Sequence, residues 1–584
     1  MPPLKALDPA PRRPLTDLWA LVGMELGRTQ DGPRGTIHLW NGRVVAFDTF
    51  TFSDHPRLDA FVQRIATEVG ISPDVGREAV LDLAVAMEVA LRESERAGKE
   101  QKASQATRMV ELALDAGLQL FHTPGADAEA YATLQVQEHE ETWRLKTRGV
   151  RRWLARLYYE AEEKSPGAQA VQDALGVLEG KALFDGPTHP VYVRLAPDAD
   201  AIILDLGNDA WQVVRITGAG WEVLKTSPVK FWRPRGLLPL PLPVPGGTLA
   251  ALRPLCNIGS DENWYLLVAW LLAALRPVGP YPILLIHGEQ GSAKSSLVRL
   301  LRLLIDPNEA ALRPTPRDER DLVIAATHGQ VIALDNVSHL ADWLSDALCR
   351  VATGAGFGTR ELYTDDEEKL FAFQRPVVIN GIEELAVRGD LLDRAILLYL
   401  PAIDPDLRKT ERAFWSEVET VHARLLGVLC TVLGQTLAAL PSVVLDQPPR
   451  MADFAHWACA AASACGWTSE DFLLAYTTMV EGANTLVLEA SSIAPFLATV
   501  VALGPRTCTA AELHKQLGEL AGEAETKKSG WPKNPRALSN ALRRLAPNLR
   551  RTGIVVSFER QPGGNRERLI TLQRQQTDRE EERF

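Results

Sequence analysis

The chain has 584 residues, of which 46% are hydrophobic and 23% are charged, and its formal net charge is −11. This length and composition predict several domains, each large enough to bury a core of its own. The N-terminal segment has no apolar signal core, and the apolar run over residues 264–275 is shorter than the roughly 20 residues that cross a bilayer, so we expect a cytoplasmic protein with no membrane partner.

The cysteine pattern and the charge distribution each limit which class of protein this chain can be. The six cysteines form no C-x-x-C pair, which argues against a zinc ribbon and against a disulfide framework. Residues 527–574 contain twelve Lys and Arg against two acidic residues, so this segment carries +10 and the rest of the chain −21. Such asymmetry indicates a localised nucleic-acid-binding surface on an otherwise acidic protein.

The first half of the chain contains no clear chemical motif. We expect a mainly helical N-terminal domain over residues 1–118 and a mixed α/β domain of unknown role over residues 119–245. The predicted helices cover residues 57–69, 74–97, 149–162 and 167–180. The predicted strands cover residues 36–52, 191–195, 201–206 and 211–216. The Pro-rich residues 233–247 end this half, because they cannot continue a helix or a central strand.

One pair of carboxylates in this half has two interpretations. Asp198 and Asp200 form a D-x-D, which polymerase and primase sites use to hold two metals. They lie in the sequence PDAD between two alternating strands, where turn chemistry alone favours aspartate. We favour the hairpin turn and do not use this pair to predict a primase activity.

A phosphate-binding loop is predicted near the middle of the chain, in the sequence ILLIHGEQGSAKSS at residues 283–296. A short apolar strand leads into small residues, and a helix begins near Lys294, so backbone N–H groups and the helix dipole would bind phosphates. Lys294 would reach the phosphates of ATP, and the Ser295 hydroxyl would ligate Mg²⁺. The predicted nucleotide-binding residues are Gly288, Glu289, Gln290, Gly291, Ser292, Ala293, Lys294, Ser295 and Ser296.

One residue departs from the usual G-x-x-x-x-G-K-[ST] pattern of such loops. Ala293 stands where glycine is expected, and its methyl group requires a negative φ or mild strain. The alternative interpretation of the segment is an ordinary strand-to-helix turn.

Two further apolar strands end in polar residues. Residues 331–334 precede Asp335, which would hold Mg²⁺ through water at the strand's end. Asn336 follows, where many ring ATPases have a glutamate that polarises the attacking water. An amide cannot take a proton, so we expect either slow hydrolysis or a base that is Asp335 itself or an acid elsewhere. Residues 376–379 precede Asn380, which would sense the γ-phosphate from a strand between the other two. Plain turns are the alternative at both positions.

An arginine follows this third strand. Asp390 and Asp393 precede Arg394 and the apolar residues 395–400. Arg394 is a candidate arginine finger, which stabilises transition-state charge at a neighbouring subunit's nucleotide; a surface ion pair with Asp390 or Asp393 is the alternative. The predicted catalytic residues are Lys294, Asp335, Asn336, Asn380 and Arg394, and the predicted metal ligands are Ser295 and Asp335.

A glycine-rich segment lies between the second and third strands, in the sequence LCRVATGAGFGTRELYTDDEE at residues 348–368. A flexible approach to a hairpin with a basic residue suits a loop that enters a ring pore and grips a phosphate backbone. Arg350 and Arg360 are the candidate DNA contacts, and a solvated loop is the alternative.

The order of these segments resembles the ATPase core of superfamily 3 helicases, particularly the primase-helicase type of phages, poxviruses and mobile elements. The segments that carry the resemblance are HGEQGSAKSS, VIALDNVS, CRVATGAGFGTRELYTDDEE, RPVVINGI and DLLDRAILLYL. In that family they are Walker A, Walker B, a pore hairpin, an Asn-bearing sensor and an arginine finger. The resemblance covers about residues 280–402 and implies a homo-hexameric ring that moves along single-stranded DNA with ATP. Ala293 and Asn336 depart from the family's pattern.

The second half of the chain is expected to form the ATPase core and the domains that follow it. We expect the ATPase core with its helical lead-in over residues 246–435, a helical domain over 436–500, a winged helix over 501–574 and a disordered tail over 575–584. The sequence RALSNALRRLAPNLRRTGI also resembles the winged helix attached to such helicases. The predicted DNA contacts are Arg350, Arg360, Arg536, Asn540, Arg543, Arg544, Arg560, Arg566 and Arg568.

These segments together predict a multidomain α/β protein with a central P-loop (AAA+-like) ATPase, a mainly helical N-terminal region and a C-terminal winged helix. The predicted function is an ATP-dependent DNA helicase or translocase of a phage or mobile genetic element, acting in replication as an oligomeric ring. Single-stranded DNA in the ring and duplex DNA at the winged helix are the expected partners. The alternative is a nucleotide-switched DNA-binding regulator or replication initiator with weak hydrolysis. A small-molecule P-loop kinase is disfavoured, because it leaves the basic C-terminal unit without a role.

Overall fold

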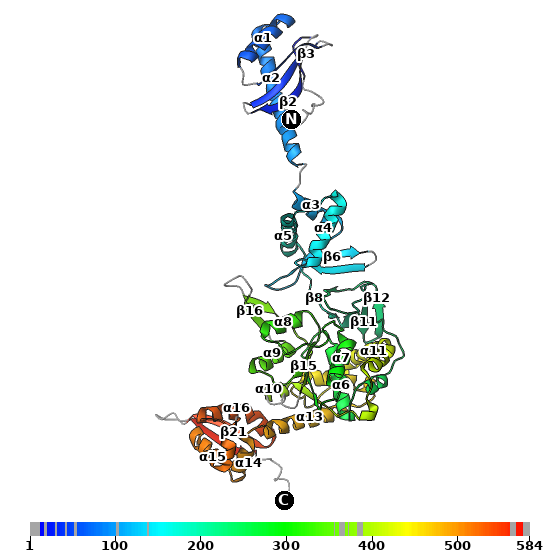
Figure 1. The fold of residues 1–584 in the computed structure, drawn as a ribbon, viewed down its shortest axis with the longest axis vertical. Helices are drawn as coiled ribbons and strands as arrows, with labels where there is room; N and C mark the ends of the chain where they lie inside the picture. The colour runs from blue at the N-terminus through cyan, green and yellow to red at the C-terminus, as the bar shows by residue number, and fades with distance from the viewer. Residues whose placement is uncertain are drawn as a thin grey trace. The chain divides into compact units, whose positions relative to one another are not determined.

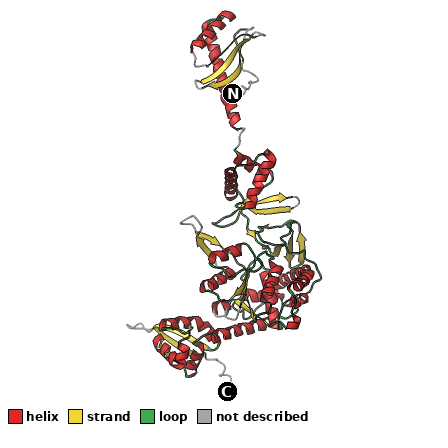
Figure 2. Cartoon of the chain, in the orientation of Figure 1, coloured by secondary structure: helices red, strands yellow, loops and turns green. Residues whose placement is uncertain are grey.

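The computed structural model of the chain is a mixed α/β protein (Figures 1 and 2). Its described residues form two compact units, one from Met1–Ala113 with Arg151–Val177 and one from Leu114–Val150 with Leu178–Phe584. The structure describes residues 12–16, 20–29, 32–40, 44–51, 55–100, 104–136, 139–354, 357–360, 368–371, 373–381, 389–528, 530–560 and 568–575.

The first unit begins with a four-stranded antiparallel sheet in the order β1-β2-β3-β4. Its strands are β1 (Arg12–Pro14), β2 (Ala20–Thr29), β3 (Gly32–Trp40) and β4 (Val44–Thr51). Helices α1 (His55–Val69), α2 (Pro73–Glu100) and α3 (Gln105–Asp115) follow. Helix therefore exceeds strand among the described residues of the predicted mainly helical region, but β1, β2 and the start of β3 were not predicted. Strands β2 and β3 contain glycines and a proline, which weaken the strand signal in a sequence.

Two helices from later in the chain complete the first unit. They are most of α4 (Arg148–Glu162) and the first part of α5 (Ala168–Phe184), up to Val177. Arg108 Nε donates a hydrogen bond to Glu162 Oε1 at 3.0 Å, and Gly167 N donates to Gln105 Oε1 at 3.0 Å. The predicted boundary after residue 118 therefore separates residues that lie together, because these contacts join segments that are far apart in the sequence.

The second unit begins with small antiparallel sheets. Strands β5 (Gln119–His122), β6 (Ala130–Val136) and β7 (His139–Arg144) form one sheet. Strands β9 (Leu195–Asp198), β10 (Ala201–Asp205), β11 (Val213–Thr217) and β12 (Gly220–Leu224) form another, and β8 (Val191–Tyr192) pairs with β13 (Lys230–Phe231). Asp198 and Asp200 lie at the β9–β10 hairpin, where Ala199 has a φ of 53°. This confirms the turn interpretation of the D-x-D sequence.

A parallel sheet in the order β15-β18-β14-β19 lies at the centre of the second unit. Its strands are β14 (Ile283–Gly288), β15 (Ile332–Val337), β18 (Val377–Gly381) and β19 (Ala395–Leu400). The strands are apolar runs because both faces of the sheet are buried: Leu284 and Ile286 lie in one hydrophobic core, and Ile283 and Leu285 lie in another. Strand β18 lies between β15 and β14, as predicted.

Helices connect and cover these strands (Figure 1). They include α6 (Asp261–Ala274), α7 (Lys294–Ile305), α8 (Glu319–Thr327), α9 (Asp342–Thr353) and α10 (Gly389–Leu392). Helices α11 (Glu411–Ala439), α12 (Ala452–Cys465) and α13 (Ser469–Glu489) share one hydrophobic core with α6. Residues 436–489 therefore share a core with the central sheet, which differs from the predicted separate helical domain.

Helix α11 is long and contains a strongly apolar stretch. Residues 411–442 are long and apolar enough to cross a membrane by length and composition, and half of the most apolar window is buried within the protein. Its buried residues Leu425, Leu429 and Leu433 lie in the core that also contains α6. Packing within the unit therefore accounts for this apolar composition.

A buried ion pair attaches residues 190–245 to the end of α7. The Arg194 guanidinium lies 3.2 Å from Asp306 Oδ1, and both side chains are fully buried. Arg194 also donates hydrogen bonds to the backbone oxygens of Asp205 and Leu238. Burial lowers the pKa of the neighbouring Arg302, and Asp306 opposes this effect. The paired charges fix the position of the segment, since removing one partner would leave a buried charge uncompensated.

The C-terminal part of the second unit is a small α/β arrangement. It contains α14 (Ala494–Ala502), β20 (Arg506–Thr509), α15 (Ala510–Thr526), α16 (Pro535–Arg551), β21 (Ile554–Arg560) and β22 (Arg568–Arg574), with the sheet order β20-β22-β21. Asn534 Oδ1 accepts a hydrogen bond from Ala537 N at 2.8 Å and caps α16. Residues 561–567, between β21 and β22, and residues 576–584 of the predicted tail lie outside the described residues.

Candidate functional site

The loop between β14 and α7 lies at the carboxyl edge of the parallel sheet, where open α/β sheets bind ligands. Gly288 ends β14 with a φ of 143°, and a side chain there would overlap the carbonyl oxygen of Leu400 on β19. Gly291 has a φ of 80°. Both conformations favour glycine, so these two residues allow the loop to turn sharply against the neighbouring strand.

The structure shows how Ala293 replaces the expected glycine. Its backbone is left-handed, with φ 63° and ψ 30°, and it caps α7 without a side-chain hydrogen bond. The sequence allowed either a negative φ or mild strain at Ala293, and the structure shows the strained conformation. A left-handed alanine costs about 1 kcal/mol relative to its preferred conformation.

Replacing Ala293 with glycine is therefore expected to raise the free energy of unfolding of this unit by about 1 kcal/mol. Urea unfolding followed by tryptophan fluorescence would measure the change. The matched control is Ala413→Gly on the exposed side of α11, which should lower stability because glycine is a poor helix former. A decrease with Ala293→Gly would show that the loop is not strained.

The Lys294 side chain lies inside the loop. Its Nζ donates hydrogen bonds to the backbone oxygens of Gly288 and Glu289, each at 2.7 Å, and approaches Ser292 Oγ at 3.4 Å. Ser292 is fully buried, and its hydroxyl donates to the Glu289 oxygen at 2.9 Å. The ammonium group is thus held within the loop by backbone oxygens.

Three predicted site residues meet beside this lysine. Ser295 Oγ donates a hydrogen bond to Asp335 Oδ1 at 2.8 Å. Asn380 Nδ2 donates to the same Asp335 oxygen at 2.7 Å and lies 3.2 Å from Ser295 Oγ. The residues come from α7, β15 and β18, so three neighbouring elements of the sheet position the cluster.

Asn336 contributes its backbone to this cluster. Asn336 N donates a hydrogen bond to Asn380 Oδ1 at 2.6 Å. The residue has a φ of 52°, and its side chain is exposed. Asparagine tolerates this left-handed conformation better than most residues, so its presence here has a backbone reason independent of catalysis.

The chemistry of the cluster fits a magnesium–triphosphate ligand. Mg²⁺ usually takes one or two carboxylates, keeps several waters and draws its remaining ligands from phosphates. Asp335 supplies the carboxylate and Ser295 the adjacent hydroxyl, within hydrogen-bonding distance of each other. Lys294 supplies the positive charge, and the start of α7 adds its helix dipole.

Arg394 lies at the opposite edge of the same sheet. It immediately precedes β19, which runs parallel to β14 with Ala395 opposite Ile283. A strand of six residues spans about 20 Å, so Arg394 cannot reach the loop between β14 and α7 of its own chain. Asp393 forms ion pairs with Arg450 and, at 2.9 Å, with Arg551. The side chain of Asp390 lies outside the described residues.

The two arginines predicted to contact DNA in the ring lie on different elements. Arg350 is on α9 and forms an ion pair with Glu319 of α8 at 2.6 Å. Arg360 ends β16 (Phe357–Arg360), which pairs with β17 (Glu368–Phe371) as the predicted hairpin (Figure 1). Only Arg360 is therefore on the hairpin; its side chain and residues 361–367 lie outside the described part of the chain.

The C-terminal part brings most of the remaining predicted DNA contacts together. Helix α16 buries Leu538, Leu542 and Leu549 in a local core. The predicted contacts that are exposed on the described residues are Arg536, Asn540, Arg543, Arg544, Arg560 and Arg568. Arg560 pairs with Arg568 across the β21–β22 register, and the Arg543 guanidinium lies 4.2 Å from the Phe558 ring. Arg566 lies outside the described residues.

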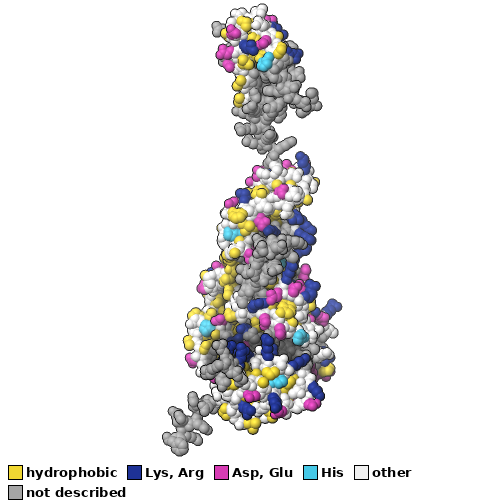
Figure 3. All heavy atoms as spheres, turned by 90° about the vertical axis from the view of Figure 1, so that its left-hand side faces the viewer, with side chains coloured by type: hydrophobic (Ala, Val, Ile, Leu, Met, Phe, Trp, Pro, Cys, Tyr) yellow, Lys and Arg dark blue, Asp and Glu magenta, His cyan; other side chains and the backbone are white. Residues whose placement is uncertain are grey.

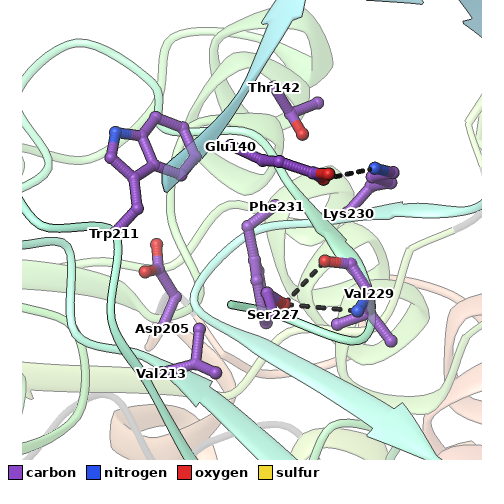
Figure 4. A pocket seen from close by; sticks show the side chains of 9 residues that line it. All are labelled: Glu140, Thr142, Asp205, Trp211, Val213, Ser227, Val229, Lys230 and Phe231. Atoms are coloured by element: carbon purple, nitrogen blue, oxygen red, sulfur yellow. Dashed lines mark hydrogen bonds and ion pairs between the residues drawn. The ribbon is translucent and has the colours of Figure 1, made fainter. Parts of the chain in front are cut away.

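A small pocket lies between the β5–β7 sheet and the strands that follow it (Figure 4). Its volume is about 20 Å³, which is room for little more than one water molecule. Lys230 Nζ pairs with Glu140 at 3.0 Å, and Ser227 Oγ donates to the Val229 oxygen at 2.6 Å. The pocket is thus too small for a nucleotide, and these polar groups already have hydrogen-bond or ion-pair partners.

On the face drawn in Figure 3, acidic and basic side chains are interspersed, so the net negative charge forms no continuous acidic surface there.

Two residues near the phosphate loop were not predicted. Asn257 Nδ2 donates hydrogen bonds to the backbone oxygens of Ser292, at 3.1 Å, and Pro401, at 2.6 Å. It therefore ties the loop to the segment that follows β19. Arg408, in that same segment, lies against Gly291. Neither residue belongs to a local motif, so the sequence carries no signal for either.

The chain was compared with curated proteins and with solved structures. No curated protein matches the sequence. The A form apo structure of the NrS-1 C-terminal region is 10% identical and aligns over 80% of this chain and 99% of that chain, with a TM-score of 0.37. An A form apo structure of its residues 305–718 is 12% identical over 64% of this chain and 75% of that chain, with a TM-score of 0.32. At these values, the likeness shows no shared function.

The sequence also matches two parts of one protein family. Residues 249–484 match the actinomycete integrative conjugative element replication protein, RepA, and residues 493–582 match the RepA C-terminal domain. The first match contains the central sheet with α11 and α12, and the second contains α15, α16 and the C-terminal sheet. Together they cover more than half of the chain, which therefore belongs to the RepA family of replication proteins from actinomycete integrative conjugative elements.

Proposed function

We propose that this mobile-element replication protein is an ATP-dependent DNA helicase or translocase. Its core would be a P-loop, AAA+-like ATPase of the superfamily 3 type, located in the cytoplasm. The observation that carries the proposal is the cluster of Ser295, Asp335 and Asn380 beside Lys294 at the carboxyl edge of the parallel sheet. A lysine, a hydroxyl and a carboxylate at this edge are groups that suit a magnesium–triphosphate ligand.

Each residue of the cluster has a defined task in this proposal. Lys294 would bind the charged phosphates, and Ser295 with Asp335 would hold Mg²⁺, which neutralises charge on the phosphates when bound. Asn380 lies within 2.7 Å of Asp335 Oδ1 and would orient the attacking water. The Asn336 amide cannot accept a proton, so we expect slower turnover than in an enzyme with glutamate at this position.

The position of Arg394 supports assembly from several subunits. Because Arg394 lies at the edge opposite Lys294, it could act only on the nucleotide of another subunit. A homo-oligomeric ring, which we propose to be a hexamer, offers each arginine to a neighbour. The hairpin of β16 and β17 would then contact single-stranded DNA within the ring.

The C-terminal part is proposed to be a winged helix that binds duplex DNA. Contacts to phosphates release counterions, so each lost contact lowers the slope of log affinity against log salt by about 1. We expect Arg536→Ala and Arg544→Ala each to produce this change, measured by fluorescence anisotropy of labelled duplex DNA. Lys515→Ala is the matched control, since that lysine is 80% exposed on α15; slopes equal to the control would remove these arginines from the DNA surface.

The direct test of the proposed function compares ATP hydrolysis with and without single-stranded DNA. A helicase or translocase should be stimulated by DNA and should displace an annealed strand. A second candidate function rests on Asn336: a nucleotide-switched initiator that hydrolyses ATP slowly. That protein would bind DNA in an ATP-dependent manner and would displace no strand, which would contradict the helicase proposal.

A further inference from the structure

The segment after β19 is held against the phosphate loop of its own chain. Asn257 bonds both Ser292 O and Pro401 O, so these two backbones are tied together. The 3-10 helix η4 (Pro405–Leu407) follows and is capped by the Asp404 side chain, which accepts a hydrogen bond from Asp406 N at 3.1 Å. Arg408 is the next residue. These hydrogen bonds therefore hold the backbone of the segment in place up to the residue before Arg408.

The Arg408 guanidinium lies against the middle of the phosphate loop. A Cβ atom placed on Gly291 would be 3.6 Å from Arg408 Nη2. Gly291 itself is exposed and carries no side chain, so nothing on this residue screens the guanidinium from the loop. Arg408 thus approaches the loop from outside, whereas Lys294 lies within it.

The charges around Arg408 distinguish it from neighbouring basic residues. Lys409 pairs with Glu417 at 2.5 Å, and Arg299 pairs with Glu411 at 2.8 Å. Among the described side chains, no carboxylate forms an ion pair with Arg408, whose Nε makes one long hydrogen bond of 3.4 Å to Ile403 O. Arg408 and Lys294 both bring positive charge to this loop, and like charges repel each other. An anion bound at the loop would remove this repulsion.

We infer that Arg408 binds the phosphate chain of the nucleotide in its own subunit. The inference rests on the proposed function, because the ligand is the nucleoside triphosphate of that site. A guanidinium presents a planar fork of donors that matches phosphate oxygens, which an ammonium does not. Arg408 and Lys294 then bind the phosphates from two sides of the loop, and Arg394 acts from a different subunit.

The experiment is a calorimetric titration of the full-length chain with MgATP. The proteins compared are the wild type, Arg408→Ala, Arg408→Lys and the control Arg412→Ala, which removes an equal charge from an exposed position four residues away. A lost charge-assisted contact weakens binding by about 10-fold or more. We expect that loss for Arg408→Ala, a smaller loss for Arg408→Lys, and affinity within about 2-fold of wild type for Arg412→Ala.

Melting temperatures without nucleotide separate binding from folding. All four proteins should melt alike, because Arg408 is exposed and makes one weak contact. If the wild type binds ATP and Arg408→Ala binds as tightly as Arg412→Ala, the inference is overturned and the proposed function stands. If the affinity loss is matched by earlier melting in both Arg408 variants, the residue is structural and the inference is overturned. Absence of ATP binding by the wild type would overturn both proposals.

Discussion

Replacing Arg394 with alanine is expected to leave ATP binding intact and to reduce ATP turnover by about 10³-fold or more, the usual effect of removing an arginine finger. The reason is its position before β19, at the edge of the sheet opposite Lys294. Arg394 can stabilise transition-state charge only at another subunit's nucleotide. Calorimetry would measure binding, and steady-state phosphate release would measure turnover.

A mixing experiment provides the control for this prediction. Chains with Arg394→Ala keep an intact phosphate loop, and chains with Lys294→Ala keep an intact arginine. If the arginine acts between subunits, mixed assemblies should regain part of the turnover that each variant lacks alone. Turnover by Arg394→Ala equal to wild type would remove this residue from the site, and a mixture as inactive as its components would contradict action between subunits.

Replacing Lys294 with alanine is expected to reduce ATP turnover by about 10²- to 10³-fold, the range for loss of one preorganised donor to developing charge. ATP affinity should fall as well, because the ammonium is the only cation that lies inside the described loop. Phosphate release and MgATP titration on the same preparations would measure the two effects.

The matched control for Lys294 is a lysine outside the loop. Lys409→Ala removes an exposed lysine that pairs with Glu417, and such surface pairs contribute little. It should therefore leave turnover within about 2-fold of wild type. If Lys294→Ala hydrolysed ATP as well as this control, the loop between β14 and α7 would not be the phosphate site.

The central sheet and its cluster were predictable because their signals are local. The apolar runs at residues 331–334 and 376–379 each lead into a polar residue, and parallel strands place their carboxyl ends at one edge. Asp335 and Asn380 could therefore be placed beside Ser295 before their hydrogen bonds were known. The position of β18 between β15 and β14 came from the family resemblance and is confirmed by the strand order.

Other parts of the site depend on contacts that no local pattern reports. Asn257 lies 35 residues before Ser292 in the sequence and contacts its backbone oxygen. Arg408 reaches the loop because the segment after β19 turns back toward it. The strain at Ala293 was one of two outcomes that the sequence allowed, and the backbone geometry decides between them.

The grouping of segments into units was the least predictable part of the fold. Residues 151–177 join the first unit through contacts such as Arg108 with Glu162. Helices α12 and α13 bury apolar residues in the core that α6 also occupies. Periodicity shows which face of a helix is apolar and does not show which partner covers it.

The proposed ATP hydrolysis and the proposed roles of Arg394 and Arg408 all require binding of a magnesium–triphosphate at the loop between β14 and α7. The measurement that tests this is a calorimetric titration of the folded, full-length chain with MgATP. We predict saturable binding at one site per chain that is lost or strongly weakened by Lys294→Ala. A wild-type chain that is folded and takes up no ATP would contradict the account.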